Sequence, residues 1–307
     1  MKDFFTRLAR ARDCGASDVV EQDYHLHRLL QEVSVDEYLG GNLVFKGGTC
    51  LVKAYTGYFR FSQDIDFTWK DDAIWKGRSA NELSAKCSSE ISNIVRRFKR
   101  ITDDLGLTFR GDKRIDSEVH PSSGGKMVEL KPRYRSEVLG VPSEIKIQIN
   151  LVDMISYPVG IRPLASYIDD IDLPDLSFLY PEPYAKYREK VELECYDLQE
   201  IFVEKCRAAL TRTAYKPRDT LDILKMEGVY GYSIKGYRKQ IIEKTRFALD
   251  RYERYRTNIH ERVFPEDFRI SGVEEKLLLE PLPGDIGAEA RRVHRELEMM
   301  IDEILER

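Results

Sequence analysis

The residues best suited to chemistry lie between positions 46 and 66. Asp64 and Asp66 are two residues apart, so in a strand their carboxylates project from one face, while Ile65 and Phe67 point to the other. Paired carboxylates of this kind suit Mg²⁺ that also contacts substrate phosphates. Upstream, Lys46-Gly47-Gly48-Thr49 has the composition of a turn whose backbone N–H groups favour an anion such as phosphate. Together the two patterns predict a site for a metal ion and a phosphorylated substrate.

The elements that must position these residues are predicted in the order strand, turn, helix, strand. Residues 43–45 are an apolar run typical of a short buried strand, and residues 49–55 have the spacing of a short helix. The next strand is expected to carry Arg60, Ser62, Asp64 and Asp66 on one face. Either motif alone is more often a plain turn or a solvated strand edge. Their combination is what favours a functional site.

The combined pattern resembles the signature of the DNA polymerase β nucleotidyltransferase superfamily and, in more detail, the AbiEii/AbiGii nucleotidyltransferase toxins. Residues 20–24 are similar to the EKDY segment of that family, with Gln22 in place of its usual lysine. The resemblance extends from about residue 20 to about residue 225. Its motifs are Phe45-Lys46-Gly47-Gly48-Thr49, Arg60-x-Ser62-x-Asp64-Ile65-Asp66-Phe67, Glu204-Lys205-x-x-Ala208 and Arg218-Asp219-x-x-Asp222.

This resemblance implies an enzyme that moves a nucleoside monophosphate from an NTP to an acceptor hydroxyl and releases pyrophosphate. The implied fold is α/β, or α+β, with a polymerase-β-like N-terminal domain on a mixed sheet and a mainly helical C-terminal domain. The implied cofactor is Mg²⁺, with Mn²⁺ as the alternative. Members act in toxin–antitoxin or phage-defence systems, and some add nucleotides to the 3′ end of tRNA, which blocks translation. We therefore expect tRNA and a cognate antitoxin as partners.

The same resemblance assigns roles to individual residues. Asp64 and Asp66 are expected to hold the metal and to be catalytic, together with Lys205 and Asp219. Lys53 and Lys205 would neutralise phosphate charge. From the residues alone, Lys205 and Asp219 could equally form an ordinary salt bridge between helices, and residues 20–24 could be a solvated helix face. The residues expected to contact the nucleotide are Lys46, Gly47, Gly48, Thr49, Lys53, Ser62 and Asp222.

A third carboxylate, which polymerase-β-like enzymes often place on a later strand, is missing from the expected position. Gln148 cannot neutralise a metal ion, so the sequence leaves Glu144, Asp153 or a later residue such as Asp219 as its source. Two alternatives to transfer onto RNA also stay open. One is a GTP- or NTP-binding growth inhibitor that transfers nothing, and the other is an enzyme that modifies a protein hydroxyl. The alternating face of the strand predicted at 144–151 carries Glu144, Lys146, Gln148 and Asn150.

Apolar periodicity and turn residues predict two domains. The family resemblance implies that residues 1–160 form the nucleotidyltransferase domain and that residues 190–307 form a helical domain that completes the active site. Residues 161–189, rich in Pro and Asp, are predicted as the connection. Asp197-x-x-Glu200 has the spacing of a helix capping box. The other expected elements are helices at 1–17, 18–39 (capped by Ser17), 81–105, 233–256 and 286–305, and strands at 107–113, 126–135, 144–151 and 191–196.

Composition is that of an ordinary globular protein. Of 307 residues, 42% are apolar and 33% charged, and no apolar run approaches the roughly 20 residues that span a membrane. The start of the chain lacks the apolar core of a signal peptide, so we expect a cytoplasmic protein without a membrane partner. The five cysteines are scattered without a C-x-x-C pair, which predicts small buried side chains instead of disulfides or a zinc site.

Positive charge is concentrated in residues 205–256, which hold 14 Lys and Arg against 6 Asp and Glu. In a chain of net charge −4, this excess of +8 leaves −12 on the rest. Tyr237, Tyr252 and Tyr255 interleave with the cations, a pattern that suits stacking and phosphate contact with RNA. The segment is therefore predicted to bind tRNA, although its tyrosines could equally pack inward.

Overall fold

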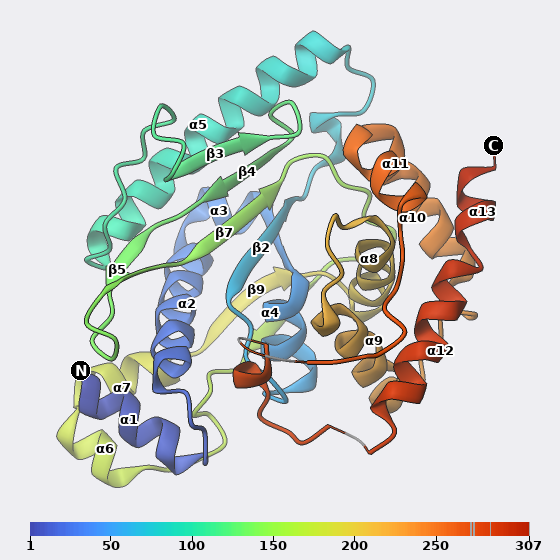
Figure 1. The fold of residues 1–307 in the computed structure, drawn as a ribbon. Coiled ribbons are helices and arrows are strands. Elements are labelled where there is room, and N and C mark those ends of the chain that lie inside the picture. The colour runs from blue at the N-terminus through green and yellow to red at the C-terminus, as the bar shows by residue number, and fades with distance from the viewer. Residues whose placement is uncertain (271, 273, 283, 307) are drawn as a thin grey trace. The chain divides into compact units, whose positions relative to one another are not determined.

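The computed structural model describes residues 1–270, 272, 274–282 and 284–306 (Figure 1). Its contacts divide the chain into two compact units, which we call unit 1 and unit 2. Unit 1 comprises Met1–Asp153 and Val159–Cys195, and unit 2 comprises Met154–Pro158 and Tyr196–Arg307. Within the described ranges, the helices are all too short or too polar to cross a membrane.

Unit 1 is built on a seven-stranded mixed sheet with the strand order β3-β4-β7-β2-β1-β9-β8. The pairs β2–β7 and β1–β9 are parallel, and the other neighbours are antiparallel. This mixed sheet confirms the predicted fold class. The strands are β1 (Leu43–Lys46), β2 (Asp64–Trp69), β3 (Val119–Ser122), β4 (Met127–Leu130), β7 (Lys146–Asn150), β8 (Gly160–Leu164) and β9 (Val191–Cys195), with β5 (Arg133–Arg135) and β6 (Pro142–Glu144) forming a separate hairpin.

Strand alternation gives the sheet one apolar and one polar face. Phe67 lies between Phe45 of β1 and Ile149 of β7, and all three side chains are buried. The neighbouring position on β2, Asp66, lies between Lys46 and Gln148. Because apolar residues bury one face, the polar side chains of β1, β2 and β7 must share the other.

Helices of unit 1 surround this sheet, and α2 packs against β9, α5 and α7. The helix α5 begins with the capping box of Ser79 and Glu82, in which each side chain bonds the other residue's backbone N–H. The helices are α1 (Lys2–Ala11), α2 (Ser17–Val35), α3 (Glu37–Asn42), α4 (Gly47–Leu51), α5 (Ala80–Asp104), α6 (Pro174–Leu179) and α7 (Pro181–Arg188), with a π-helix at Val52–Thr56 and a 3₁₀ turn at Asp72–Ile74.

Unit 2 is helical, and α8 is its centre because α9, α10, α11 and α12 all pack against it. Phe202 and Cys206 of α8 are fully buried in this core. The helices are α8 (Leu198–Thr211), α9 (Pro217–Tyr230), α10 (Arg238–Arg251), α11 (Glu253–His260), α12 (Ile286–Glu298) and α13 (Ile301–Leu305), with a 3₁₀ turn at Glu275–Leu277.

Several predicted strands are wrong. Residues 107–113 contain only an isolated bridge, between Thr108 and Arg133. The predicted strand 126–135 is two strands, because Pro132 lacks the N–H that a continuous ladder needs. β3 and β6 were not predicted, and β2 begins at Asp64, so Arg60 and Ser62 precede the strand instead of belonging to it.

The predicted helix 233–256 is also wrong. Its residues form α10 and α11, which are separated by the extended, buried Tyr252. The final helix is likewise two, α12 and α13, with a break at Met299 and the buried Met300. Ser17 is the first residue of α2, and Ala16 holds the cap position.

The segment 161–189 holds most of β8 and all of α6 and α7, and it lies within unit 1. The strand β9, placed by sequence at the start of the second domain, pairs with β1 in the sheet. Proline-rich stretches carry little periodicity even where they fold, because Pro174 and Pro181 occupy first turns of helices.

Candidate active site

The glycine turn lies directly against the second acid of β2. Gly47 has a φ of +80°, and a Cβ on it would lie 2.9 Å from both Cβ and Cγ of Asp66. Only glycine adopts this backbone conformation without strain and leaves the carboxylate in place. The structure therefore brings the turn and Asp66 together at the end of β1.

The two acids share the polar sheet face, as their spacing predicts. Asp64 and Asp66 are partly exposed, whereas Ile65 and Phe67 are buried on the opposite face. Their register partners on β7 are Lys146 for Asp64 and Gln148 for Asp66. The acids thus lie in a polar row that crosses neighbouring strands.

Lys46 completes this row on the β1 side. It is the register partner of Asp66, and its Nζ donates to Asp153 Oδ2 at 2.7 Å. Both side chains are about nine-tenths buried. Asp153, one of the candidates for the third carboxylate, therefore holds the lysine next to the acid pair.

On the β4 side, the polar row ends at Glu129, an acid that was not predicted from the sequence. Gln148 Nε2 donates to Glu129 Oε2 at 3.1 Å, and Glu129 also pairs with Lys131 and Lys146, each at 2.8 Å. Burial opposes ionisation of Glu129, but these two lysines outweigh it and lower its pKa. Glu144, another candidate for the third carboxylate, is half-exposed, and its Oε2 lies 4.0 Å from Arg133 Nε.

Thr49 and Arg60 face the protein interior. The Thr49 hydroxyl donates to the Asp64 carbonyl, and its side chain is buried. Arg60 is 2% exposed and donates to the Phe61 carbonyl at 2.7 Å. Thr49 therefore ties α4 to the start of β2, and Ser62 lies partly exposed just before that strand.

Lys53 is placed differently from its predicted role. Its Nζ lies 3.0 Å from Asp23 Oδ1, with no exposure of the lysine side chain. Tyr58 and Tyr187 donate to the same carboxylate at 2.8 and 2.6 Å. Burial lowers the pKa of Lys53, although Asp23 counteracts it, and burial raises the pKa of both tyrosines. The ammonium is thus committed to an internal partner.

The segment 20–24 is not a solvated helix face. Besides Asp23, Glu21 is fully buried and accepts from the Ser136 hydroxyl and from the backbone N–H of Glu137 at 2.7 Å. Tyr24 is 9% exposed and packs edge-on against Tyr187. The acids of this motif are therefore internal anchors of α2.

In unit 2, the predicted lysine and acids form one buried cluster. Lys205 Nζ lies 3.0 Å from Asp219 Oδ1 and 2.7 Å from Asp222 Oδ2, and Arg212 Nε lies 2.7 Å from Asp219 Oδ2. Burial opposes ionisation of Asp219, but the charges of Lys205 and Arg212 prevail and lower its pKa. Asp219 and Asp222 share one face of α9, as predicted, and hold Lys205 in a fixed position.

Glu200 does not complete the predicted capping box with Asp197. Asp197 caps α8 alone, by accepting from the Gln199 N–H. The Glu200 carboxylate instead accepts from the N–H groups of Ser156 and Tyr157, at 2.6 and 2.9 Å, and pairs with buried Lys244. Glu200 therefore anchors residues 154–158 to the helices of unit 2.

The basic segment keeps only part of its charge at the surface. Lys244 is 1% exposed because it pairs with Glu200 and donates to the Met154 carbonyl at 2.7 Å. Tyr252 is buried, and Tyr237 and Tyr255 are partly exposed. The cations of 233–256 that are exposed are Lys235, Lys239, Arg254 and Arg256.

The described residues contain no group of three His, Cys, Asp or Glu side chains placed to hold a metal ion. The donor set on β2 still fits Mg²⁺, which commonly takes one or two protein carboxylates and completes its shell with water and substrate phosphates. Four cysteines are buried and Cys14 is partly exposed. Burial raises the pKa of the Cys50 thiol well above its usual range, which disfavours thiolate ligation near Asp66.

Comparison with known proteins gives a family match and structural matches of low similarity. The sequence matches the family described as "Nucleotidyl transferase AbiEii toxin, Type IV TA system" over residues 28–307. The solved structure of JHP933 from Helicobacter pylori is 17% identical, with 93% of this chain and 96% of that chain covered and a TM-score of 0.40. A second H. pylori structure is 16% identical over 91% and 96%, also with a TM-score of 0.40. No curated protein sequence matches the chain.

Proposed function

Because the chain belongs to the AbiEii nucleotidyl transferase toxin family, we propose that it transfers a nucleoside monophosphate from an NTP to the 3′ end of tRNA and so blocks translation. One observation carries the proposal: the turn at Gly47 lies against the carboxylate of Asp66 on a polar sheet face. This geometry supports a binding mode in which the triphosphate of the NTP lies at the turn and a divalent ion lies between its phosphates and the two acids. A type IV toxin–antitoxin family also implies an antitoxin as partner.

The proposed reaction is a displacement at the α-phosphorus. The acceptor hydroxyl oxygen forms a bond to that phosphorus, the bond to the bridging oxygen of pyrophosphate breaks, and the hydroxyl proton leaves to a base. Bound Mg²⁺ would supply positive charge against the phosphoryl oxygens. Asp64 and Asp66 would hold the ion, and the backbone N–H groups of Gly47 and Gly48 would donate to the triphosphate.

Three other predicted nucleotide contacts receive more specific roles. Lys46 is the register partner of Asp66, so we assign its ammonium to the phosphates beside the turn. Thr49 would act through its backbone, because its hydroxyl is bound to the Asp64 carbonyl. Lys53 would position the turn from the interior, since its charge is balanced by Asp23. Ser62, partly exposed before β2, keeps its proposed contact with the phosphates.

The buried cluster of unit 2 is proposed to supply a second fixed cation. Asp219 and Asp222 hold Lys205 from two sides, which removes the freedom that a lysine side chain otherwise has. A preorganised ammonium stabilises developing phosphoryl charge better than a mobile one. In this proposal the two acids are positioning residues for Lys205.

The test is incubation of the full chain with each α-labelled NTP, Mg²⁺ and total RNA, followed by separation of RNA and protein. We expect label in the tRNA fraction and release of pyrophosphate. Asp64→Asn and Asp66→Asn should each lower transfer by about a hundredfold or more, because each removes a metal ligand. Asp104→Asn, an exposed acid on α5, is the matched control.

The same experiment decides between the alternatives. Label found only in protein would replace the tRNA proposal with transfer to a protein hydroxyl. Tight NTP binding without pyrophosphate release would indicate a nucleotide-binding growth inhibitor, an alternative that the neutral Gln148 keeps open. Label in tRNA that survives Asp64→Asn would contradict the assignment of the metal site.

A further inference from the structure

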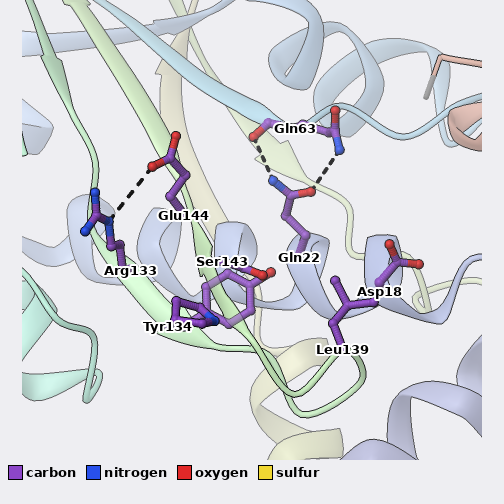
Figure 2. A pocket seen from close by; sticks show the side chains of 9 residues that line it. Asp18, Gln22, Gln63, Arg133, Tyr134, Leu139, Ser143 and Glu144 are labelled. Carbon is purple, nitrogen blue, oxygen red and sulfur yellow. Dashed lines mark hydrogen bonds and ion pairs between the residues drawn. The ribbon is translucent and has the colours of Figure 1, made fainter. Parts of the chain in front are cut away.

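A polar pocket of about 530 Å³ lies in unit 1 at the residue that precedes β2 (Figure 2). Gln22 of α2 and Gln63 line it side by side: Gln63 Nε2 donates to Gln22 Oε1 at 3.0 Å, and Gln22 Nε2 donates to the Gln63 carbonyl at 3.5 Å (Figure 2). The volume is within the range of small-molecule sites and exceeds what a single side chain fills. The other lining residues are Asp18, Arg133, Tyr134, Leu139, Pro142, Ser143 and Glu144.

The chemistry of the lining favours an uncharged ligand with a hydrogen-bonding edge. Arg133 is the only cation in the lining, against the carboxylates of Asp18 and Glu144, so nothing here would hold a triphosphate. Beyond the two bonds that join them, the carboxamides of Gln22 and Gln63 each keep a second N–H and an oxygen lone pair, and such donors and acceptors match the edges of nucleobases. Tyr134 adds an aromatic ring, which packs against His25 with 4.2 Å between ring centroids.

The position of the pocket in the strand order favours one of two ligands, the acceptor nucleoside or the nucleoside of the incoming NTP. Gln63 is followed directly by Asp64, and Glu144 comes two residues before Lys146, the register partner of Asp64. In the sheet order β7-β2-β1, the pocket hairpin leads into β7, whereas the glycine turn follows β1. In the strand order, the pocket hairpin thus belongs to the β7 side of β2 and the glycine turn to its β1 side.

Phosphoryl transfer places the attacking and leaving oxygens roughly in line on opposite sides of the phosphorus. If pyrophosphate leaves over the glycine turn, the acceptor hydroxyl approaches from the side of β7. We propose that this pocket binds the terminal nucleoside of the nucleic-acid acceptor and reads its base through Gln22 and Gln63. The inference rests on the proposed function, because it requires a nucleotide acceptor.

The test compares steady-state transfer by the unaltered chain, Gln22→Met, Gln63→Met and the double variant, on RNA acceptors that differ only in their terminal base. Methionine keeps the length of glutamine and removes both hydrogen-bonding groups. The matched control is Gln240→Met, on α10 of unit 2. We expect the KM for the acceptor to rise by about tenfold, the preference for one terminal base to weaken, and the KM for NTP to stay unchanged.

The outcomes distinguish a failure of this inference from a failure of the proposed function. RNA labelling with an unchanged acceptor KM and base preference in both single variants and the double variant would overturn the pocket assignment alone. A raised KM for NTP with an unchanged acceptor KM would also overturn it, because the pocket would then hold the incoming nucleotide. Absence of label in any RNA with the unaltered chain would overturn the proposed function and the inference together.

Discussion

Asp23 and Lys53 form an ion pair in the interior of unit 1, with 3.0 Å between Oδ1 and Nζ. The pair joins α2 to the π-helix that continues α4, so the motif at 20–24 supports the glycine turn from within. The same carboxylate accepts hydrogen bonds from Tyr58 and Tyr187. Together these contacts fix the chain directly after the turn.

The first prediction concerns this pair. Asp23→Asn should lower the free energy of unfolding of unit 1 by about 3 kcal/mol or more, because it leaves a buried ammonium without its counter-charge. Urea denaturation followed by tryptophan fluorescence reports unit 1, which holds both tryptophans, Trp69 and Trp75. Glu32→Gln on the same helix is the control. An unchanged midpoint for Asp23→Asn would show that the pair contributes no stability.

The second prediction uses two glycines with similar backbones. Gly47 and Gly57 have φ values of +80° and +70°, but a Cβ on Gly57 meets nothing within 4 Å, whereas one on Gly47 collides with Asp66. Alanine should cost about 1 kcal/mol of stability at either position. Only Gly47→Ala should also lower nucleotidyl transfer, by about tenfold or more, because it displaces the carboxylate. Equal activity of the two variants would contradict a role for the contact.

The core of the candidate site could be predicted because it is local in sequence. The strand 43–46, the turn at Gly47 and the alternation of Asp64 and Asp66 all follow from residue type and spacing. The shared helix face of Asp219 and Asp222 was also predictable, since i and i+3 positions lie on one face, whereas Lys205 was assigned to them by the family resemblance.

The rest depends on long-range register, which the sequence does not encode locally. Glu129 faces Gln148 because β4 pairs with β7 across the β5–β6 hairpin, and no spacing rule gives that alignment. Burial of Lys53 and Lys244 was missed for a similar reason. Each has a carboxylate partner from a different helix, Asp23 and Glu200, and composition alone places lysine at the surface.

The third prediction tests the missing carboxylate by exchanging two side chains. In Gln148→Glu/Glu129→Gln, the net charge and the hydrogen bond between the two positions are kept, while the acid moves one strand closer to Asp66. A third carboxylate in the row should raise the affinity for Mn²⁺ by about tenfold. Calorimetric titration measures this without any turnover. Unchanged affinity would show that Gln148 does not face the metal site.

The fourth prediction addresses the buried cluster of unit 2. Lys205→Met should abolish transfer and lower the stability of unit 2 by about 3 kcal/mol, because both buried acids lose their ion pair with Lys205 while Asp219 keeps Arg212. Lys205→Met/Asp219→Asn/Asp222→Asn should recover stability but not transfer, since the acids are neutral while the cation is still absent. Circular dichroism during denaturation and the labelling assay separate the effects. Transfer by either variant at the normal rate would show that Lys205 is not part of the active site.

The fifth prediction is a pH dependence of unit 2. His294 Nε2 lies 3.1 Å from the Tyr215 hydroxyl and 3.2 Å from Thr220 Oγ1, and its ring stacks on Phe264. Burial lowers the pKa of His294 to about 4, against about 6.5 in an unfolded chain. The unfolded state therefore binds more protons between these values. Stability is complete above pH 6.5 and is lost as the pH falls toward 4.

Hydrogen exchange in α12, corrected for intrinsic rates, measures this loss. Between pH 7 and pH 5 we expect protection to fall by on the order of 1–2 kcal/mol, and by clearly less in His294→Gln. The lowered pKa of Asp219 does not interfere, because its contribution is complete above the unfolded value and is lost only at more acidic pH. His260→Gln, an exposed position on α11, should keep the full dependence. Equal slopes in all three chains would mean that His294 has the same pKa in the folded and the unfolded state.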